Sequence, residues 1–166
     1  MSLADDRPIS GYGSRLESLA ASAIDRFRSA RNSASSQETA LQSFLREGFQ
    51  RGLKLEHLLA AFEHVLTVTD YPQSERTTLL DRATRLSTPG TYRLTVTWRS
   101  KKPSPKEIAF ARAFLPELAG TPALACKQKL EQSSAFLLGT YPTLLEAEAA
   151  KERADQLGLA TDISQP

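Results

Sequence analysis

One short segment, from Tyr92 to Trp98, constrains the fold of this chain more than any other. Apolar residues occupy positions 92, 94, 96 and 98, and Arg93, Thr95 and Thr97 lie between them. Successive side chains of an extended strand point to opposite faces, and the residue types are those that fit a half-buried sheet. We therefore predict a strand with one buried and one solvent-facing side. Because only helices are predicted before it, this strand marks the start of a second structural unit.

Amphipathic periodicity predicts four helices between residues 14 and 88. Capping-box patterns at Ser14–Glu17 and Ser35–Glu38 predict the starts of the first two helices. Gly52 is placed to end the second helix, and Asp70–Pro72 separates the third from the fourth. The predicted apolar faces comprise, helix by helix, Leu16, Leu19, Ala20, Ala23 and Phe27; Leu41, Phe44, Leu45 and Phe49; Leu55, Leu58, Leu59, Phe62 and Leu66; and Leu79, Leu80, Ala83 and Leu86. The short connections between them predict an antiparallel bundle.

The remaining residues predict the order strand, helix, helix, strand, helix, strand. The clearest helix start is Ser104, which is followed by Pro105 at the first helical position and Glu107 at the third. The predicted segments are residues 92–98, 104–115, 121–130, 135–139, 144–157 and 159–163, of which 135–139 is expected to be a buried strand. We thus predict an α+β protein with a flexible tail (residues 1–13), a helical bundle domain (14–88) and a small β-α-α-β-α-β domain (91–166). The last domain is expected to hold a three-stranded sheet with its helices on one face.

Composition limits the possible functions. The sequence has no apolar run near the roughly 20 residues that span a bilayer, and its start lacks the features of a signal peptide, so we expect a cytoplasmic protein without membrane contact. Cys126 is the single cysteine, which allows no intrachain disulfide and no thiolate metal cluster. His57 and His64 are about 10 Å apart along one predicted helix, too far to share a metal easily. No catalytic motif is evident, and we predict neither an enzyme nor a cofactor.

The strongest charge feature surrounds the end of the predicted strand. The chain as a whole has a formal net charge of +2, yet residues 93–112 hold six basic residues against Glu107 alone. The predicted partner-binding residues are Arg93, Arg99, Lys101, Lys102, Lys106 and Arg112. Such a segment is either a solvated surface, a docking surface for an acidic protein, or a contact for the phosphates of a nucleic acid. The nucleic-acid interpretation is weakened because Tyr92 and Trp98, which could stack on bases, lie on the predicted buried face.

The second half resembles the C-terminal domain of the bacterial ribosomal stalk protein, whose fold is shared by the adaptor that delivers N-degron substrates to the Clp protease. The resemblance covers residues 91–164 and concerns the first strand, an alanine- and lysine-containing second helix, a short strand with a polar turn, and a helix followed by glycine and a closing strand. The stretches that carry it are Tyr92–Trp98, Ala125–Glu131, Phe136–Gly139 with Thr143, and Ala147–Ile163. The closing stretch is also similar to half of a sporulation-related peptidoglycan-binding repeat.

This resemblance implies the fold and a protein-binding role, but the partner-binding residues of both families differ here. The first helix of the domain carries only Lys106 and Arg112 as basic residues, and the stalk protein's glycine-leucine turn is replaced by residues 117–124. Arg99 and Ser100 stand where the Clp adaptor has its asparagine-aspartate pair. We therefore predict a non-enzymatic protein-binding or adaptor protein that docks a partner through the basic sheet face and loop, with RNA or DNA binding through the same patch as the alternative.

Overall fold

The computed structural model describes residues 13–166, which divide into two compact units at the Ser87–Thr88 bond. The predicted flexible tail, residues 1–13, lies outside the described residues except for Gly13, which begins the first helix. No helix between residues 13 and 166 is both long and apolar enough to cross a membrane.

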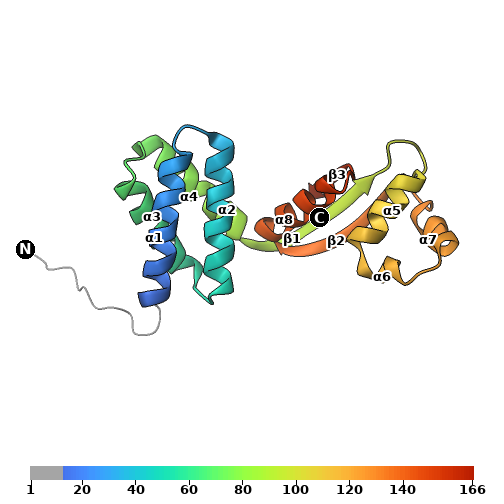
Figure 1. Ribbon diagram of the computed structural model, residues 1–166, viewed down its shortest axis with the longest axis horizontal. Helices are drawn as coiled ribbons and strands as arrows, with labels where there is room; N and C mark the ends of the chain where they lie inside the picture. Colours follow the sequence, from blue (N-terminus) through green and yellow to red (C-terminus); the bar gives the residue numbers. More distant parts are fainter. Residues whose placement is uncertain (1–12) are drawn as a thin grey trace, which may run out of the picture. The chain divides into compact units, whose positions relative to one another are not determined.

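Four helices make up the first unit (Figure 1): α1 (Gly13–Ala30), α2 (Ala34–Gln50), α3 (Leu55–Val68) and α4 (Gln73–Ser87). Helix α1 packs on α2 and α3, and α4 packs on the same two helices. The predicted four-helix unit is therefore confirmed. Its helices lie side by side because each has one apolar stripe that can be buried only against its neighbours.

The core of this unit centres on three phenylalanines. Phe27, Phe44 and Phe62 are fully buried, and the Phe62 ring centroid lies 5.1 Å from that of Phe27 and 5.5 Å from that of Phe44. The expectation that Phe49 belongs to the same core is wrong, since Phe49 is 37% exposed. Gly48 takes the position against α3, where an added Cβ would clash with the Leu58 side chain. The next residue, Phe49, is rotated by about 100° around the helix axis and so points away from α3.

The two capping boxes predicted for this unit are not formed as expected. Helix α2 is capped two residues earlier, by the Ser33 hydroxyl, which accepts a hydrogen bond from the Ser36 amide at 3.3 Å. Glu38 then lies too far along the helix to cap it, and its carboxylate pairs with Arg82 of α4. Ser14 lies inside α1 because the helix already begins at Gly13. Gly52, with φ of 75°, follows the end of α2 as predicted.

The second unit is a three-stranded antiparallel sheet with helices, which confirms the predicted α+β class. Its elements are β1 (Pro89–Thr97), α5 (Pro105–Phe114), α6 (Pro116–Ala119), α7 (Ala123–Leu130), β2 (Ala135–Thr143), α8 (Leu144–Gln156) and β3 (Thr161–Ser164). The strand order is β2-β1-β3, so the segment with strict alternation forms the central strand. Helix α8 lies along the sheet, and α5, α6 and α7 gather near the end of β1 (Figure 1). The four-residue helix α6 was not predicted.

The alternating pattern of β1 is confirmed by burial. Leu94 and Val96 are fully buried, and Trp98 just beyond the strand is 4% exposed, whereas Arg93 and Thr97 are exposed. The buried face packs against side chains from the covering helices, which include Ala111, Leu115, Leu118, Cys126, Leu130, Ala150 and Ala154. Every covering helix thus lies on one side of the sheet, and the face with Arg93 is left open.

The expectation of a buried strand at residues 135–139 is wrong in part. A strand forms there, but it runs on to Thr143 and lies at the edge of the sheet, so only Leu138 along it is buried. Leu137, on the open face, is 49% exposed. Leu138 is the extra residue of a bulge, because Leu94 pairs with Gly139 while Thr95 pairs with Leu137. An apolar run cannot reveal whether a strand is central or at an edge.

Candidate protein-binding surface

The six predicted partner-binding residues occupy two separate places in the second unit. Arg93 lies on the open face of the sheet, opposite Thr140 of β2 and Ser164 of β3. Arg99 lies six residues further on, about 20 Å away if the strand is extended. Arg99, Lys101 and Lys102 belong to the loop after β1, and the other two, Lys106 and Arg112, belong to the first and last turns of α5. The basic segment is therefore a loop-and-helix surface from which Arg93 is remote.

A buried carboxylate holds the loop in place. Glu107 is 6% exposed, and its two oxygens accept hydrogen bonds from the Arg99 amide at 3.2 Å and the Ser104 amide at 3.1 Å. The Ser104 hydroxyl in turn accepts from the Glu107 amide, which completes the capping box predicted for α5. Burial alone would raise the pKa of Glu107, but the hydrogen bonds at Ser104 and Arg99 and the charge of Arg99 together lower it. The side chain is thus ionised at neutral pH and ties both ends of the loop to α5.

Arg112 has a structural role that its charge did not reveal. Its guanidinium donates hydrogen bonds to the carbonyl oxygens of Leu118, Ala119 and Thr121, each at 3.3 Å. These carbonyls belong to α6 and the turn after it, so Arg112 holds that turn against α5. Lys101, Lys102 and Lys106 are exposed and form no ion pair with any residue in the described part of the chain. Of the predicted set, these three lysines are the charges most available to a partner.

A groove of about 540 Å³ lies between α5 and α7, and two of these lysines are sequence neighbours of residues that line it. Its lining is mainly apolar and comprises Pro103, Pro105, Ile108, Ala109, Arg112, Ala123, Leu124, Lys127 and Glu131. Lys102 directly precedes one lining proline and Lys106 directly follows the other. At the other helix, Lys127 pairs with Glu131 at 3.7 Å, and both side chains are partly exposed. The result is an apolar groove whose surroundings are mainly basic.

Leu124 is a groove residue that the sequence analysis did not assign to a site. It lies in the same helix as Cys126 and Leu130 but is 68% exposed. Cys126 and Leu130 are four residues apart and share a face, whereas Leu124 precedes Cys126 by two residues and points to nearly the opposite side. That spacing was a readable signal. A large apolar side chain left this exposed beside a groove is suited to contact a partner.

The aromatic side chains near the basic residues are not available for stacking. Trp98 is buried, and its indole N–H donates to the carbonyl oxygens of Leu130 and Ser133, each at 3.2 Å. Tyr92 is 7% exposed. Both side chains lie on the buried face of the sheet, as the alternation predicted.

Other candidate residues form no catalytic or metal-binding arrangement in residues 13–166. Cys126 is fully buried in the apolar core of the second unit. His64 is exposed, and no three His, Cys, Asp or Glu residues of the described chain are grouped to hold a metal ion.

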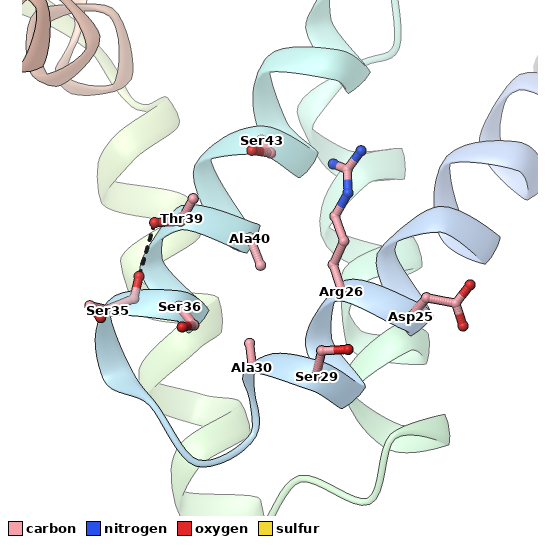
Figure 2. A pocket seen from close by; sticks show the side chains of 9 residues that line it. All are labelled: Asp25, Arg26, Ser29, Ala30, Ser35, Ser36, Thr39, Ala40 and Ser43. Atoms are coloured by element: carbon pink, nitrogen blue, oxygen red, sulfur yellow. Dashed lines mark hydrogen bonds between the residues drawn. The ribbon is translucent and has the colours of Figure 1, made fainter.

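A second hollow lies in the first unit, between α1 and α2 (Figure 2). It has a volume of about 640 Å³ and is lined largely by small and hydroxyl-bearing residues: Asp25, Arg26, Ser29, Ala30, Ser35, Ser36, Thr39, Ala40 and Ser43. Two polar groups of the lining already have partners within the protein. Arg26 pairs with Glu47 at 2.7 Å, and the Thr39 hydroxyl donates to the Ser35 carbonyl at 3.0 Å. Asp25 points away from these hydroxyls in Figure 2. The hollow therefore offers space but no convergent chemistry.

Comparison with known proteins identifies no relative: no family model, no curated protein and no solved structure matches this chain. The resemblance of residues 91–164 to the ribosomal stalk domain stays a prediction.

Proposed function

We propose that this chain is a non-enzymatic protein-binding protein, and that its second unit docks an acidic segment of a partner protein in the groove between α5 and α7. One observation carries the proposal: an apolar groove with an exposed leucine, Leu124, is lined by two prolines whose sequence neighbours, Lys102 and Lys106, have no ion pair among the described residues. Apolar contact in a groove supplies affinity, and complementary charge around it supplies selectivity and speed of association.

The shape of the groove favours a segment that inserts one or two apolar side chains. Helix-in-groove recognition uses apolar anchors with charged flanks, and here the flanks would be Asp or Glu opposite Lys101, Lys102 and Lys106. The predicted resemblance concerns this same unit and is in keeping with a protein-docking role. The partner-binding residues of the stalk protein and of the Clp adaptor differ from those of this chain, so the partner is defined only by its chemistry.

Peptide display on the immobilised full-length chain tests this proposal. We expect enrichment of sequences with Leu, Ile or Phe flanked by Asp or Glu. For a selected peptide, Leu124→Ser should weaken binding about tenfold or more, which corresponds to about 1.4 kcal/mol. The double reversal Lys101→Glu with Lys102→Glu should weaken it further and make the remaining binding less sensitive to added salt, because the attraction that salt screens has been removed.

Arg93→Glu provides the matched control. It makes the same kind of charge reversal on the open sheet face, remote from the groove, and should leave peptide binding nearly unchanged. A stronger loss from Arg93→Glu than from the lysine reversals would place the site on the sheet face instead. Selection of peptides without acidic residues would contradict the proposal that the partner segment is acidic.

Nucleic-acid binding is the second candidate, and the three lysines without ion pairs are the observation in its favour. Since Trp98 and Tyr92 are buried, contact would be limited to phosphates and would show little sequence preference. Titration of labelled RNA and DNA at two salt concentrations tests it. Binding that falls steeply with salt and is lost in the Lys101→Glu, Lys102→Glu variant would support this candidate, and no binding at low salt would exclude it.

A further inference from the structure

The two edge strands of the sheet, β2 and β3, differ in length and in charge. β3 is four residues long, carries Asp162, and the carbonyl oxygen of its Thr161 accepts a hydrogen bond from the Lys151 ammonium at 2.7 Å. Short length and charge are common ways in which proteins prevent an edge strand from pairing further. β2 is nine residues long, and Ala135–Thr143 contains no charged residue. A bulge at Leu138 and Pro142 also limit pairing at β2, but β2 is the longer and uncharged edge, so it is the edge of this sheet better suited to accept another strand.

The hydrogen-bond pattern fixes which groups of β2 point outward. The Thr97 amide donates to Ala160, on the β3 side of β1, and the Trp98 amide donates to Ser134, on the β2 side. In an antiparallel sheet this direction alternates, so Arg93 and Thr95 also direct their backbone groups towards β3. Their partners across β2, Thr140 and Leu137, then do not bond to β1 and direct their own N–H and C=O groups outward.

Two other outward-directed positions of β2, Ala135 and Pro142, are consistent with this assignment of its backbone groups. Ala135, the partner of Thr97, has its carbonyl oxygen occupied by the Ser133 hydroxyl. Pro142 follows the inward-directed Tyr141, so its missing N–H falls on the outer edge, where proline is tolerated in a sheet. Leu137 and Thr140 remain as consecutive outward residues with both backbone groups unused by β1, and the side chain of Leu137 is 49% exposed.

We propose that two copies of this chain associate through the outer edges of their β2 strands, as an antiparallel pair about a two-fold axis. With Leu137 opposite Thr140 of the second copy, and Thr140 opposite Leu137, each pair exchanges two backbone hydrogen bonds, and the arrangement is the same from either copy. A strand without charge can lie beside an identical strand without repulsion, whereas the other edge strand, β3, carries Asp162. The exposed Leu137 would be covered in the process. A single strand pair buries little area, so the association should be weak and reversible.

Sedimentation of the full-length chain over a range of concentrations tests this proposal, with Thr140→Pro as the variant. Proline at position 140 lacks the outward-directed N–H. It leaves the hydrogen bonds between β1 and β2 in place, because Thr140 does not bond to β1. We expect the wild-type chain to dimerise and Thr140→Pro to raise the dimer dissociation constant at least about tenfold. Thr140→Val is the matched control, because it keeps the N–H, and it should dimerise like the wild type. A chain that stays monomeric, or equal dissociation constants for both variants and the wild type, would overturn the proposal.

Amide hydrogen exchange on the wild-type chain gives a second test that requires no substitution. The amides of Leu137 and Thr140 should become more protected as the concentration rises, while the Tyr141 amide, already bonded within the sheet, should not change. Protection that is independent of concentration at both amides would contradict the proposed pairing even if a dimer formed elsewhere. Peptide binding in the groove is measured separately, so either proposal can fail without the other.

Discussion

The two units of this protein differ in whether their ion pairs join different helices. In the helical unit, charges are paired between helices: Arg26 of α1 lies 2.7 Å from Glu47 of α2, and Arg82 of α4 lies 2.8 Å from Glu38 of α2. In the sheet unit, the lysines beside the α5–α7 groove have no such partner among the described residues. Charges that are paired internally contribute little to recognition, whereas unpaired charges beside an apolar groove can be paired by a partner. The difference is in keeping with the proposal that the second unit carries the interaction surface.

Both units join residues that lie far apart in the sequence. In the helical unit, Phe27 packs on Phe62 and Glu38 pairs with Arg82. In the second unit, the central strand pairs with residues far along the chain, as between Thr95 and Leu137 or Thr95 and Asp162.

Trp98, the single tryptophan, lies in the second unit, so its fluorescence reports on that unit while the far-ultraviolet circular dichroism is dominated by helices.

The largest effect is expected from Phe62→Ala. Phe62 is fully buried between Phe27 and Phe44, and truncation of such a residue costs about 3–5 kcal/mol. The helical transition in a urea titration should shift to much lower urea, and the Trp98 transition should shift far less. Phe49→Ala removes a 37% exposed ring as the control and should have a small effect. Equal shifts of both transitions would contradict the separation into two units.

Leu94→Ala makes the reciprocal change in the second unit. Leu94 is fully buried at the centre of β1, and its loss should cost about 2–5 kcal/mol. The Trp98 transition should now shift more than the helical one. Leu124→Ala, at a residue that is 68% exposed, is the control and should leave the Trp98 transition almost in place. A large effect of the control would mean that Leu124 packs on the core, contrary to the proposed groove contact.

Glu107→Gln should have a smaller effect that depends on pH. The pKa of Glu107 is lowered in the folded protein because, despite burial, hydrogen bonds at Ser104 and Arg99 favour the ionised carboxylate. The unfolded chain therefore binds a proton more readily, and stability from this group is present above the unfolded pKa of about 4.3 and lost as pH falls through the lower folded pKa. At neutral pH the substitution should cost about 1–2 kcal/mol, the value of charge-assisted hydrogen bonds.

The difference between Glu107→Gln and wild type should therefore shrink as the pH falls below about 4. Urea titrations followed by Trp98 fluorescence at several pH values measure it. Glu117→Gln, at an exposed residue of α6, is the control and should show no comparable change. A difference that is constant with pH would mean that the carboxylate charge of Glu107 does not stabilise the loop.

The smallest effect is expected from the ion pairs of the helical unit. Arg82→Ala removes the contact with Glu38, and because both side chains are about one-third exposed the loss should be at most about 1 kcal/mol and smaller in high salt. Arg85→Ala, an exposed arginine of the same helix, is the control. If Arg82→Ala cost much more than this, the inter-helix ion pairs would be a major source of stability rather than a way of neutralising the surface.

Much of the fold could be predicted because it depends on local patterns. The helical stripes, the alternation from Tyr92 to Trp98, and Gly52 and Gly158, with φ of 75° and 92° after α2 and α8, all express preferences that act within a few residues. The complete capping box at Ser104 and Glu107 formed as predicted, since Pro105 leaves few alternatives for that start. Where two serines competed, at Ser33 and Ser35, the pattern selected the wrong cap, because the residue where the helix begins depends on how α2 packs.

The candidate site was only partly predictable. Sequence alone determined the order and type of the elements other than the short helix α6, the buried side of β1, and the concentration of positive charge after it. Tertiary structure decided the rest: that β1 is central and β2 an edge, that Arg112 bonds to the carbonyls of α6, and that Leu124 faces a groove. The physical reason is distance along the chain. Which strands pair and which helices lie side by side depends on contacts between residues tens of positions apart, and no local pattern of charge or hydrophobicity specifies them.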